Sequence, residues 1–249
     1  MAKPILVANW KNHPGSLPEA RTLIQKFSRQ RALYKKITFF IAPPAPYLEL
    51  VATKAKSFAK LASQNIFEQE KGTHTGEITP EILKSFGTRM TIVGHSERRA
   101  LGESSIQTAN KVRVALKAGI TPLVCVGEDV RDSEGEHFEF LREQIKSFLS
   151  LVNKKEINKV VIAYEPVWAI GREAIEPVEL SQTIIFIKKV LSDLFGRALA
   201  ENVSILYGGS VDESNAQELL HTGVKGFLVG RASLNAKNLE SITKSLITK

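Results

Sequence analysis

Residues 104 to 126 read SSIQTANKVRVALKAGITPLVCV and contain, in order, a helix-like segment, a glycine and a short apolar run. Serine is favoured at the start of a helix, and the apolar residues that follow recur at helical spacing. Gly119 is typical of a helix end, and the run Pro122–Val126 is apolar enough for a strand that is buried on both faces. The stretch therefore predicts one helix that leads into one buried strand.

The same alternation of apolar run and helical pattern extends along the whole chain of 249 residues, with further helical patterns at 16–27, 133–149 and 176–191. The runs that fit buried strands are Ile5–Ala8, Ile37–Ala42, Ala59–Ser63, Met90–Gly94, Pro122–Val126, Val160–Tyr164, Val203–Tyr207 and Gly226–Val229. Eight βα units close most simply into a parallel barrel, so we expect an α/β fold in which residues 1–249 form a single (βα)8 barrel domain. A doubly wound open sheet is the alternative, but it needs a topological switch point and usually has fewer strands.

Composition and charge favour a compact protein of enzyme size. The chain is 43% hydrophobic, has no apolar run of membrane-spanning length, and starts with MAKPILVANWK, which lacks the apolar region of a signal peptide, so we expect a cytoplasmic location and no membrane partner. The formal net charge is +8, but the basic residues are mixed with acidic ones, which favours a solvated surface over a nucleic-acid site. Cys125 is the only cysteine and lies in an apolar run, so we expect a buried thiol without a chemical role.

Polar residues follow several of the predicted strands. The carboxyl ends of all strands in a parallel barrel open at one mouth, where active sites of such barrels lie. These residues are Asn9 and Lys11 after the first strand, Gln64 and Asn65 after the third, His95 after the fourth and Glu165 after the sixth. Taken singly, the lysine is most simply a surface residue and the histidine a satisfied structural one. Gathered at one mouth, a buried carboxylate, a cation and an imidazole can transfer protons.

Two glycine turns follow the last two strands, at Gly208–Ser210 and at Gly230–Arg231. Such turns open backbone N–H groups toward a shared corner, where barrels of this type commonly bind phosphate. We therefore expect a phosphate site, to which Ser210 adds a hydroxyl. Arg231 either adds a positive charge or points to water.

Six segments of the chain carry a family resemblance. They are NWK at 9–11, TGEITPEIL at 75–83, VGHSERR at 93–99, AYEPVWAIG at 163–171, YGGSV at 207–211 and FLVGRASL at 227–234. Together, and in this order, they resemble the triosephosphate isomerases over nearly the whole chain. The resemblance implies reversible interconversion of dihydroxyacetone phosphate and D-glyceraldehyde 3-phosphate, a step of glycolysis and gluconeogenesis, with no metal and no organic cofactor.

The resemblance also implies a role for each site residue. Glu165 would be the base, and His95 the electrophile, which the family is known to keep neutral at a helix N-terminus. Lys11 and Asn9 would bind the substrate and stabilise the negative charge of the enediolate, and Glu97 would anchor Lys11. The phosphate would be held by main-chain N–H groups of Gly171, Ser210, Gly230 and Arg231.

The segment after Glu165 resembles the family's mobile lid, so the base and the lid would form one continuous piece. By resemblance, Tyr207 would contact the closed lid and Glu128 the open lid. The C-terminal hinge departs from the family pattern, because residues 172–176 read REAIE and the segment is shortened. The rate of lid movement is therefore not implied by the resemblance.

The resemblance implies a homodimer as the partner arrangement, with the loop around Thr75 reaching the partner's Asn9 and Lys11. Residues 12–15, NHPG, depart from the family pattern where that loop would dock. Two other functions stay open: a barrel isomerase that acts on a phosphoribosyl amine, and an inactive basic barrel that serves as a binding protein. The first does not predict Lys11, His95 and Glu165 together, and the second would be expected to have lost one of them.

Overall fold

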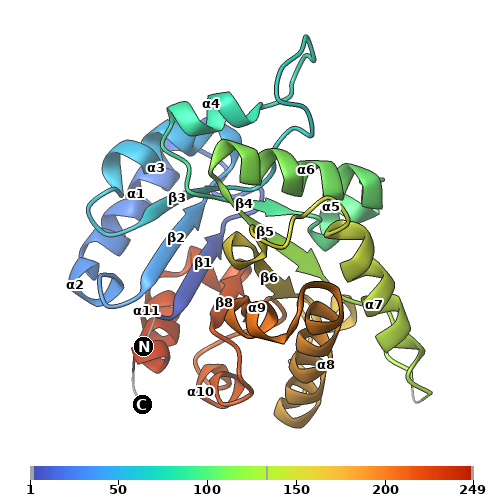
Figure 1. The fold of residues 1–249 in the computed structure, drawn as a ribbon. Coiled ribbons are helices and arrows are strands. Elements are labelled where there is room, and N and C mark those ends of the chain that lie inside the picture. The colour runs from blue at the N-terminus through green and yellow to red at the C-terminus, as the bar shows by residue number, and fades with distance from the viewer. Residues whose placement is uncertain (1–2, 133, 248–249) are drawn as a thin grey trace.

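The computed structural model describes residues 3–132 and 134–247, and its strands form one closed barrel (Figure 1). Each strand pairs in parallel with the next along the chain, and β8 pairs with β1. The strands are β1 Ile5–Asn9, β2 Thr38–Ala42, β3 Lys60–Ser63, β4 Met90–Val93, β5 Thr121–Val126, β6 Val161–Tyr164, β7 Ser204–Tyr207 and β8 Gly226–Val229. The predicted barrel is confirmed, the ends of its strands differ from the prediction by at most one residue, and the open sheet is wrong.

Helices surround the barrel on its outside (Figure 1). They are α1 Leu17–Ser28, α2 Arg31–Tyr34, α3 Leu48–Lys54, α4 Pro80–Ser85, α5 Ser96–Ala100, α6 Ser105–Ala118, α7 Glu136–Phe148, α8 Pro177–Phe195, α9 Arg197–Asn202, α10 Ala216–Leu220 and α11 Ala236–Ile247, with 3-10 turns η1 Ala45–Tyr47, η2 Ile157–Lys159, η3 Val167–Ala169 and η4 Arg231–Leu234. A capping box between Ser104 and Gln107 starts α6, and Gly119 ends it with a left-handed φ of 74°. The predicted start of α7 at Ser133 lies outside the described residues.

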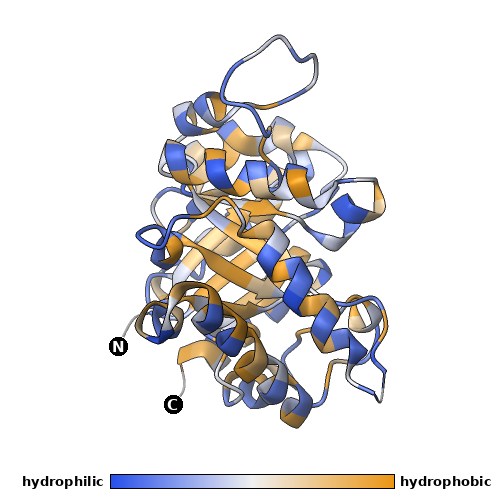
Figure 2. Ribbon diagram, turned by 45° about the vertical axis from the view of Figure 1, so that its right-hand side comes forward, coloured by the Kyte–Doolittle hydropathy of each residue, from blue (hydrophilic) through white to orange (hydrophobic). Residues whose placement is uncertain are grey.

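The core has two layers, because successive side chains of a strand point to opposite faces. In β5, Leu123 and Cys125 belong to the cluster inside the barrel, whereas Val124 and Val126 pack outward against the helices. Both layers are buried, which explains why the strands appear in the sequence as continuous apolar runs. Figure 2 shows the same division, with hydrophobic strands inside and hydrophilic outer faces on the helices.

Closure of the barrel depends on Gly226, where β8 meets β1. Its φ is 143°, and a Cβ atom at this position would lie 1.8 Å from the carbonyl oxygen of Ile5. Residues with a side chain rarely adopt this conformation, and the contact would be a collision with backbone. A glycine is therefore required for the two strands to pair at this point.

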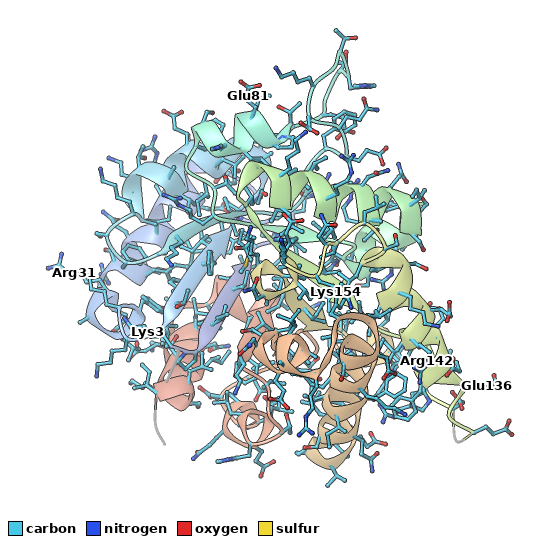
Figure 3. The ribbon with its side chains drawn as sticks, in the orientation of Figure 1. Lys3, Arg31, Glu81, Glu136, Arg142 and Lys154 are labelled. Atoms are coloured by element: carbon cyan, nitrogen blue, oxygen red, sulfur yellow. The ribbon has the colours of Figure 1, made fainter. Side chains whose placement is uncertain are left out.

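Charged side chains are distributed around the outside of the molecule. Those labelled in Figure 3 point away from the barrel on different flanks, with Lys3 and Arg31 on one side and Glu136 and Arg142 on the other. The segment between β3 and α4 extends furthest from the body (Figure 1). Within the described part of the chain, no helix combines the length and apolar character needed to cross a membrane.

Candidate active site

His95 and Glu165 meet at the carboxyl ends of β4 and β6. The Nε2 atom of His95 lies 3.3 Å from Oε1 of Glu165, and the backbone N–H of Ser96 approaches the other carboxylate oxygen at 3.4 Å. Glu165 is 1% exposed and His95 is 6% exposed. Burial removes most of the water that would otherwise solvate this carboxylate, so the imidazole and the N–H group are its neighbours instead.

The first turn of α5 determines which nitrogen of His95 carries the proton. His95 is the residue that caps this helix, and its Nδ1 accepts a hydrogen bond of 3.1 Å from the backbone N–H of Glu97. A nitrogen that accepts a hydrogen bond cannot carry a proton, so the hydrogen of the neutral ring is on Nε2. His95 therefore directs an N–H donor toward Glu165 and the mouth of the barrel.

Lys11 is held in place through both its side chain and its backbone. Its Nζ donates to Oε1 of Glu97 at 2.7 Å, which is the anchoring contact predicted from the sequence. Its φ of 51° lies in the left-handed region, and it is the only residue other than glycine with a positive φ in the described parts of the chain. Asn9 Oδ1 accepts the Lys11 N–H at 3.0 Å, and Gln64 Nε2 donates to the Lys11 carbonyl at 2.7 Å. These two bonds offset the strain of this conformation.

These residues form a continuous series of contacts. Lys11 contacts Glu97, Glu97 lies 3.7 Å from His95 Nδ1 through its second oxygen, and His95 contacts Glu165. The series also reaches the glycine turn after β8, because a Cβ atom on Gly230 would lie 3.2 Å from Cε of Lys11. The structure thus brings together the acid, the imidazole, the ammonium and the predicted phosphate corner.

The predicted phosphate corner offers free backbone donors. The N–H groups of Ser210, Gly230 and Arg231 donate to no other group among the described residues. The N–H of Gly171 is different, because it donates to Ser210 Oγ at 3.2 Å. Arg231 has an ordinary backbone conformation, so the position tolerates a side chain, and that side chain is exposed. Three of the four predicted N–H groups can therefore donate to a bound anion without breaking an existing hydrogen bond.

Comparison with known proteins gives one family. The sequence model described as triosephosphate isomerase matches residues 4–246. A triosephosphate isomerase of Dehalococcoides mccartyi is 41% identical over 249 residues, which cover 98% of this chain and 96% of that protein. The triosephosphate isomerase of Syntrophotalea carbinolica is 36% identical, and the match covers 98% of this chain and 98% of that protein. The triosephosphate isomerase of Dictyostelium discoideum is 42% identical, and the match covers 86% of this chain and 85% of that protein.

The chain belongs to the triosephosphate isomerase family. The resemblance inferred from the six segments is thereby confirmed. The matches to the Dehalococcoides mccartyi and Syntrophotalea carbinolica triosephosphate isomerases each cover 98% of this chain.

In this triosephosphate isomerase family member, the segment that the resemblance identifies as a lid forms hydrogen bonds near both of its ends. Trp168 Nε1 donates to Glu128 Oε1 at 2.9 Å, and the N–H of Ile175 donates to the Tyr207 hydroxyl at 3.3 Å. Ser210 Oγ also donates to the Ala169 carbonyl at 2.9 Å. The resemblance implied that Glu128 and Tyr207 contact different lid positions, but here both contacts occur in one arrangement. Burial raises the pKa of Tyr207 to about 12, so its hydroxyl keeps its proton at neutral pH.

Gly208 leaves room for the side chain of Glu165. Its N–H is already used, because it donates to the Tyr164 carbonyl at 2.8 Å. A Cβ atom on Gly208 would lie 2.7 Å from Cγ of Glu165, so only glycine leaves room for this side chain. The N–H of Gly208, which was not among the expected phosphate donors, is therefore not available to an anion, whereas the N–H of Ser210 donates to no other described group.

A buried ion-pair network supports the loop that carries His95. Glu103 has a side chain that is 2% exposed, and its Oε1 accepts the backbone N–H of Gly94 at 3.1 Å. Its Oε2 accepts from Lys111 at 2.6 Å and from Arg98 at 3.0 Å. Burial opposes ionisation of Glu103, but the hydrogen bonds and charges of Lys111 and Arg98 outweigh it and lower the pKa of this carboxyl.

Replacing Glu103 with glutamine is expected to reduce the free energy of unfolding by about 3 kcal/mol at pH 7, because Lys111 would remain buried without its charge partner. The pKa of Glu103 is lower in the folded protein than its ordinary value of 4.5. The ionised carboxylate therefore stabilises the fold fully above pH 4.5, and this stabilisation is lost as the pH falls from 4.5 through the folded-state pKa. Urea unfolding of both proteins from pH 7 to pH 3 checks this. The gap between them should shrink below pH 4.5, and a gap that widens would contradict the assignment.

Sequence reasoning missed the roles of two residues at this site, Gln64 and Glu103. Gln64 was recognised at a strand end, but its two bonds to the carbonyls of Lys11 and Ala42 could not be foreseen. Glu103 lies between two helices and has no periodic pattern that marks it as buried. Cys125 was predicted to be a buried thiol, and it is fully buried; burial and the nearby Glu165 carboxylate raise the pKa of the thiol.

Proposed function

We propose that the chain interconverts dihydroxyacetone phosphate and D-glyceraldehyde 3-phosphate through an enediolate, with Glu165 as the base and His95 as the electrophile. The observation that carries this proposal is the contact between Nε2 of His95 and the buried carboxylate of Glu165, beside the ammonium of Lys11. Membership of the triosephosphate isomerase family supports the same reaction. No observation favours the inactive binding protein, and the phosphoribosyl amine isomerase is not the family that matches.

Each residue has a distinct part in the proposed reaction. Glu165 takes a proton from the carbon next to the carbonyl and returns a proton to its neighbour. His95 donates from Nε2 to the carbonyl oxygen and moves protons between the two oxygens. Lys11 stabilises the negative charge of the enediolate, and the amide nitrogen of Asn9 helps to orient its oxygens, since its Oδ1 is already used by Lys11. Glu97 holds Lys11 in position.

The phosphate does not react, so its binding energy is available to assemble the site. We assign it to the N–H groups of Ser210, Gly230 and Arg231, with Gly171 joining if its bond to Ser210 Oγ is exchanged for the phosphate. A closed lid would exclude water from the enediolate and keep it from losing its phosphate. No metal or cofactor takes part in the proposed steps.

The direct test is turnover of D-glyceraldehyde 3-phosphate, followed through dihydroxyacetone phosphate with a coupled NADH-dependent dehydrogenase. Purified protein is expected to give turnover that is proportional to its concentration and insensitive to chelators. Absence of turnover in protein that unfolds cooperatively would refute the isomerase function.

Arg231 is proposed to add a positive charge to the phosphate site. Arg231→Gly is expected to raise KM about fivefold with little change in kcat, because an exposed charge contributes about 1 kcal/mol to substrate and transition state alike. Steady-state kinetics at low and high salt checks this, since the difference should decrease at high salt. An unchanged KM at low salt would mean that Arg231 points to water. Exposed Arg197 on α9, changed to glycine, is the control for lost surface charge.

The homodimer and the cytoplasmic location stay predictions. Residues 69–77, including Thr75, are exposed in the segment that projects between β3 and α4, which is what a loop that docks on a second copy requires (Figure 1). Sedimentation equilibrium should give twice the mass of 27.5 kDa. Thr75→Arg should shift the protein toward the monomer and lower its activity. A monomer mass for the unmodified protein as well as for Thr75→Arg would refute the dimer.

A further inference from the structure

Gln144 is a polar residue on the buried face of α7. It is 8% exposed, and its neighbours on this face, Leu141, Ile145 and Phe148, belong to the layer of the core between the barrel and the helices. α7 packs on β5 from outside the barrel (Figure 1). A buried amide is costly unless its oxygen and nitrogen are hydrogen-bonded. The partners of Gln144 therefore show what this side chain holds.

The side-chain amide of Gln144 binds the backbone of Gly127, the residue that follows β5. Its Oε1 accepts the N–H of Gly127 at 2.7 Å, and its Nε2 donates to the carbonyl of Gly127 at the longer distance of 3.4 Å. Among the described residues, no backbone carbonyl accepts this N–H. The carbonyl has a second donor, because Arg99 Nη2 donates to it at 3.2 Å. The N–H of Gly127 thus depends on Gln144, whereas its carbonyl is also held by Arg99.

Gly127 touches the backbone of the proposed base. A Cβ atom at position 127 would lie 1.8 Å from the carbonyl oxygen of Glu165 and 2.5 Å from its carbonyl carbon. The two backbones can approach so closely only because residue 127 is glycine. The preceding residue adds a hydrogen bond, since the N–H of Glu165 donates to the Val126 carbonyl at 2.7 Å. The main chain of Glu165 therefore rests on residues 126 and 127.

The same backbone segment is linked to the loop that carries His95. Arg99 donates through Nη1 to the carbonyl of Gly94, the residue before His95, and to that of Cys125 at 3.5 Å. β5 lies between β4, which leads to His95, and β6, which leads to Glu165. The end of β5 thus contacts the backbone beside both proposed catalytic residues.

We propose that Gln144 is a positioning residue for Glu165, because by holding Gly127 it fixes the main chain on which the base rests. In the described part of the chain, the side-chain hydrogen bonds of Gln144 go to Gly127 alone, so its effect on the reaction passes through the backbone. Displacing a reacting group by 1 Å can lower a rate about a hundredfold. The catalytic consequence rests on the proposed isomerase function, whereas the effect on the Glu165 backbone does not.

The test compares Gln144→Met with Gln107→Met as a matched control. Methionine has nearly the volume of glutamine but lacks the amide donor and acceptor. The side chain of Gln107 also binds a backbone N–H, because its Oε1 accepts that of Ser104 at 3.0 Å in the capping box of α6. None of the hydrogen bonds of Gln107 in the described chain reaches residues 125–127. The control therefore loses the same kind of bond at another place.

The first measurement does not need turnover. Exchange of the Glu165 backbone N–H for deuterium is compared with exchange of the Ile162 N–H in β6, which corrects for changes in global stability. The ratio of the two rates is expected to rise about tenfold in Gln144→Met, since the bond from Glu165 to Val126 loses its support. Gln107→Met should leave this ratio unchanged.

The second measurement is steady-state turnover of D-glyceraldehyde 3-phosphate. Gln144→Met is expected to lower kcat about tenfold and to keep KM within about twofold of wild type, because the N–H groups assigned to the phosphate are not displaced. Gln107→Met should lose stability but retain wild-type kcat. Gln144→Glu keeps an acceptor for the Gly127 N–H, and Arg99 still holds the carbonyl, so this variant should recover most of the lost kcat.

A double-mutant cycle separates positioning of the base from general damage to the fold. In Glu165→Gln the base is already absent, so adding Gln144→Met should lower kcat no further. Damage that is independent of the base would lower kcat by the same factor in both backgrounds.

The outcomes separate the two proposals. If wild-type protein lacks turnover, the isomerase function fails, and the exchange of the Glu165 N–H still decides whether Gln144 holds this backbone. If Gln144→Met leaves either the exchange ratio or kcat at the wild-type value, or lowers kcat equally in the Glu165→Gln background, the positioning role is wrong. Should Gln144→Met fail to fold, Gln144→Glu replaces it, with an increase of about threefold expected in the exchange ratio, and an unchanged ratio would overturn the proposal.

Discussion

Replacing Glu165 with glutamine is expected to lower kcat by about a hundredfold to ten-thousandfold, the range observed when a general base is lost. Glutamine has nearly the same shape, so it can fill the space beside Gly208, but it cannot take a proton from carbon. The contact with His95 Nε2 would also change from a charged to a neutral acceptor. The coupled assay measures the loss, and the free energy of unfolding should not fall with it.

Two further variants separate loss of the base from loss of the lid. Glu173→Gln removes an exposed carboxylate of the lid and is expected to retain wild-type kcat. Gly208→Ala keeps the carboxylate but places a Cβ atom within 2.7 Å of its Cγ, so an intermediate loss is expected as Glu165 is displaced. Wild-type kcat in Glu165→Gln would show that another group is the base.

The barrel was predictable because its strands are buried on both faces. β5 and β6 contribute side chains to the barrel interior and to the helix layer at alternate positions, so neither face requires polar residues. The helices between them carry ordinary start and stop residues, such as Ser104 and Gly119 in α6. Local composition and global topology agree along the chain, and such agreement is what makes a fold readable from its sequence.

The candidate site was predictable only in part, because a sequence shows residue types but not their contacts. The convergence of His95, Glu165 and Lys11 followed from their places after parallel strands. The left-handed backbone of Lys11 did not, since it depends on a hydrogen bond from Gln64, which follows another strand. The ion pair between Arg131 and Glu179 of α8, whose Nε and Oε1 atoms are 3.6 Å apart, likewise depends on tertiary position and leaves no local pattern.

Glu97 contacts both Lys11 and His95. Glu97 uses one oxygen to bind Lys11 at 2.7 Å, while its other oxygen is 3.7 Å from His95 Nδ1 and too distant to accept a proton from it. The backbone N–H of Glu97 donates a hydrogen bond to His95 Nδ1 instead. This bond leaves Nε2 as the nitrogen of His95 that faces Glu165.

Replacing His95 with alanine is expected to lower kcat about a thousandfold or more, because the carbonyl oxygen would lose both its donor and the group that moves protons between the oxygens. His95→Gln can still donate a hydrogen bond but cannot relay a proton in the same way, so about a hundredfold loss is expected. The exposed His221, changed to glutamine, is the matched control and should retain full activity.

The proton position on His95 can be measured separately from the rate. Nitrogen-15 chemical shifts should identify Nε2 as the protonated nitrogen and Nδ1 as the acceptor, as the bond from the Glu97 N–H requires. If the shifts placed the hydrogen on Nδ1, Nε2 could not donate to a carbonyl oxygen. The electrophile would then have to be sought elsewhere, and the ammonium of Lys11 would be the remaining donor at this mouth of the barrel.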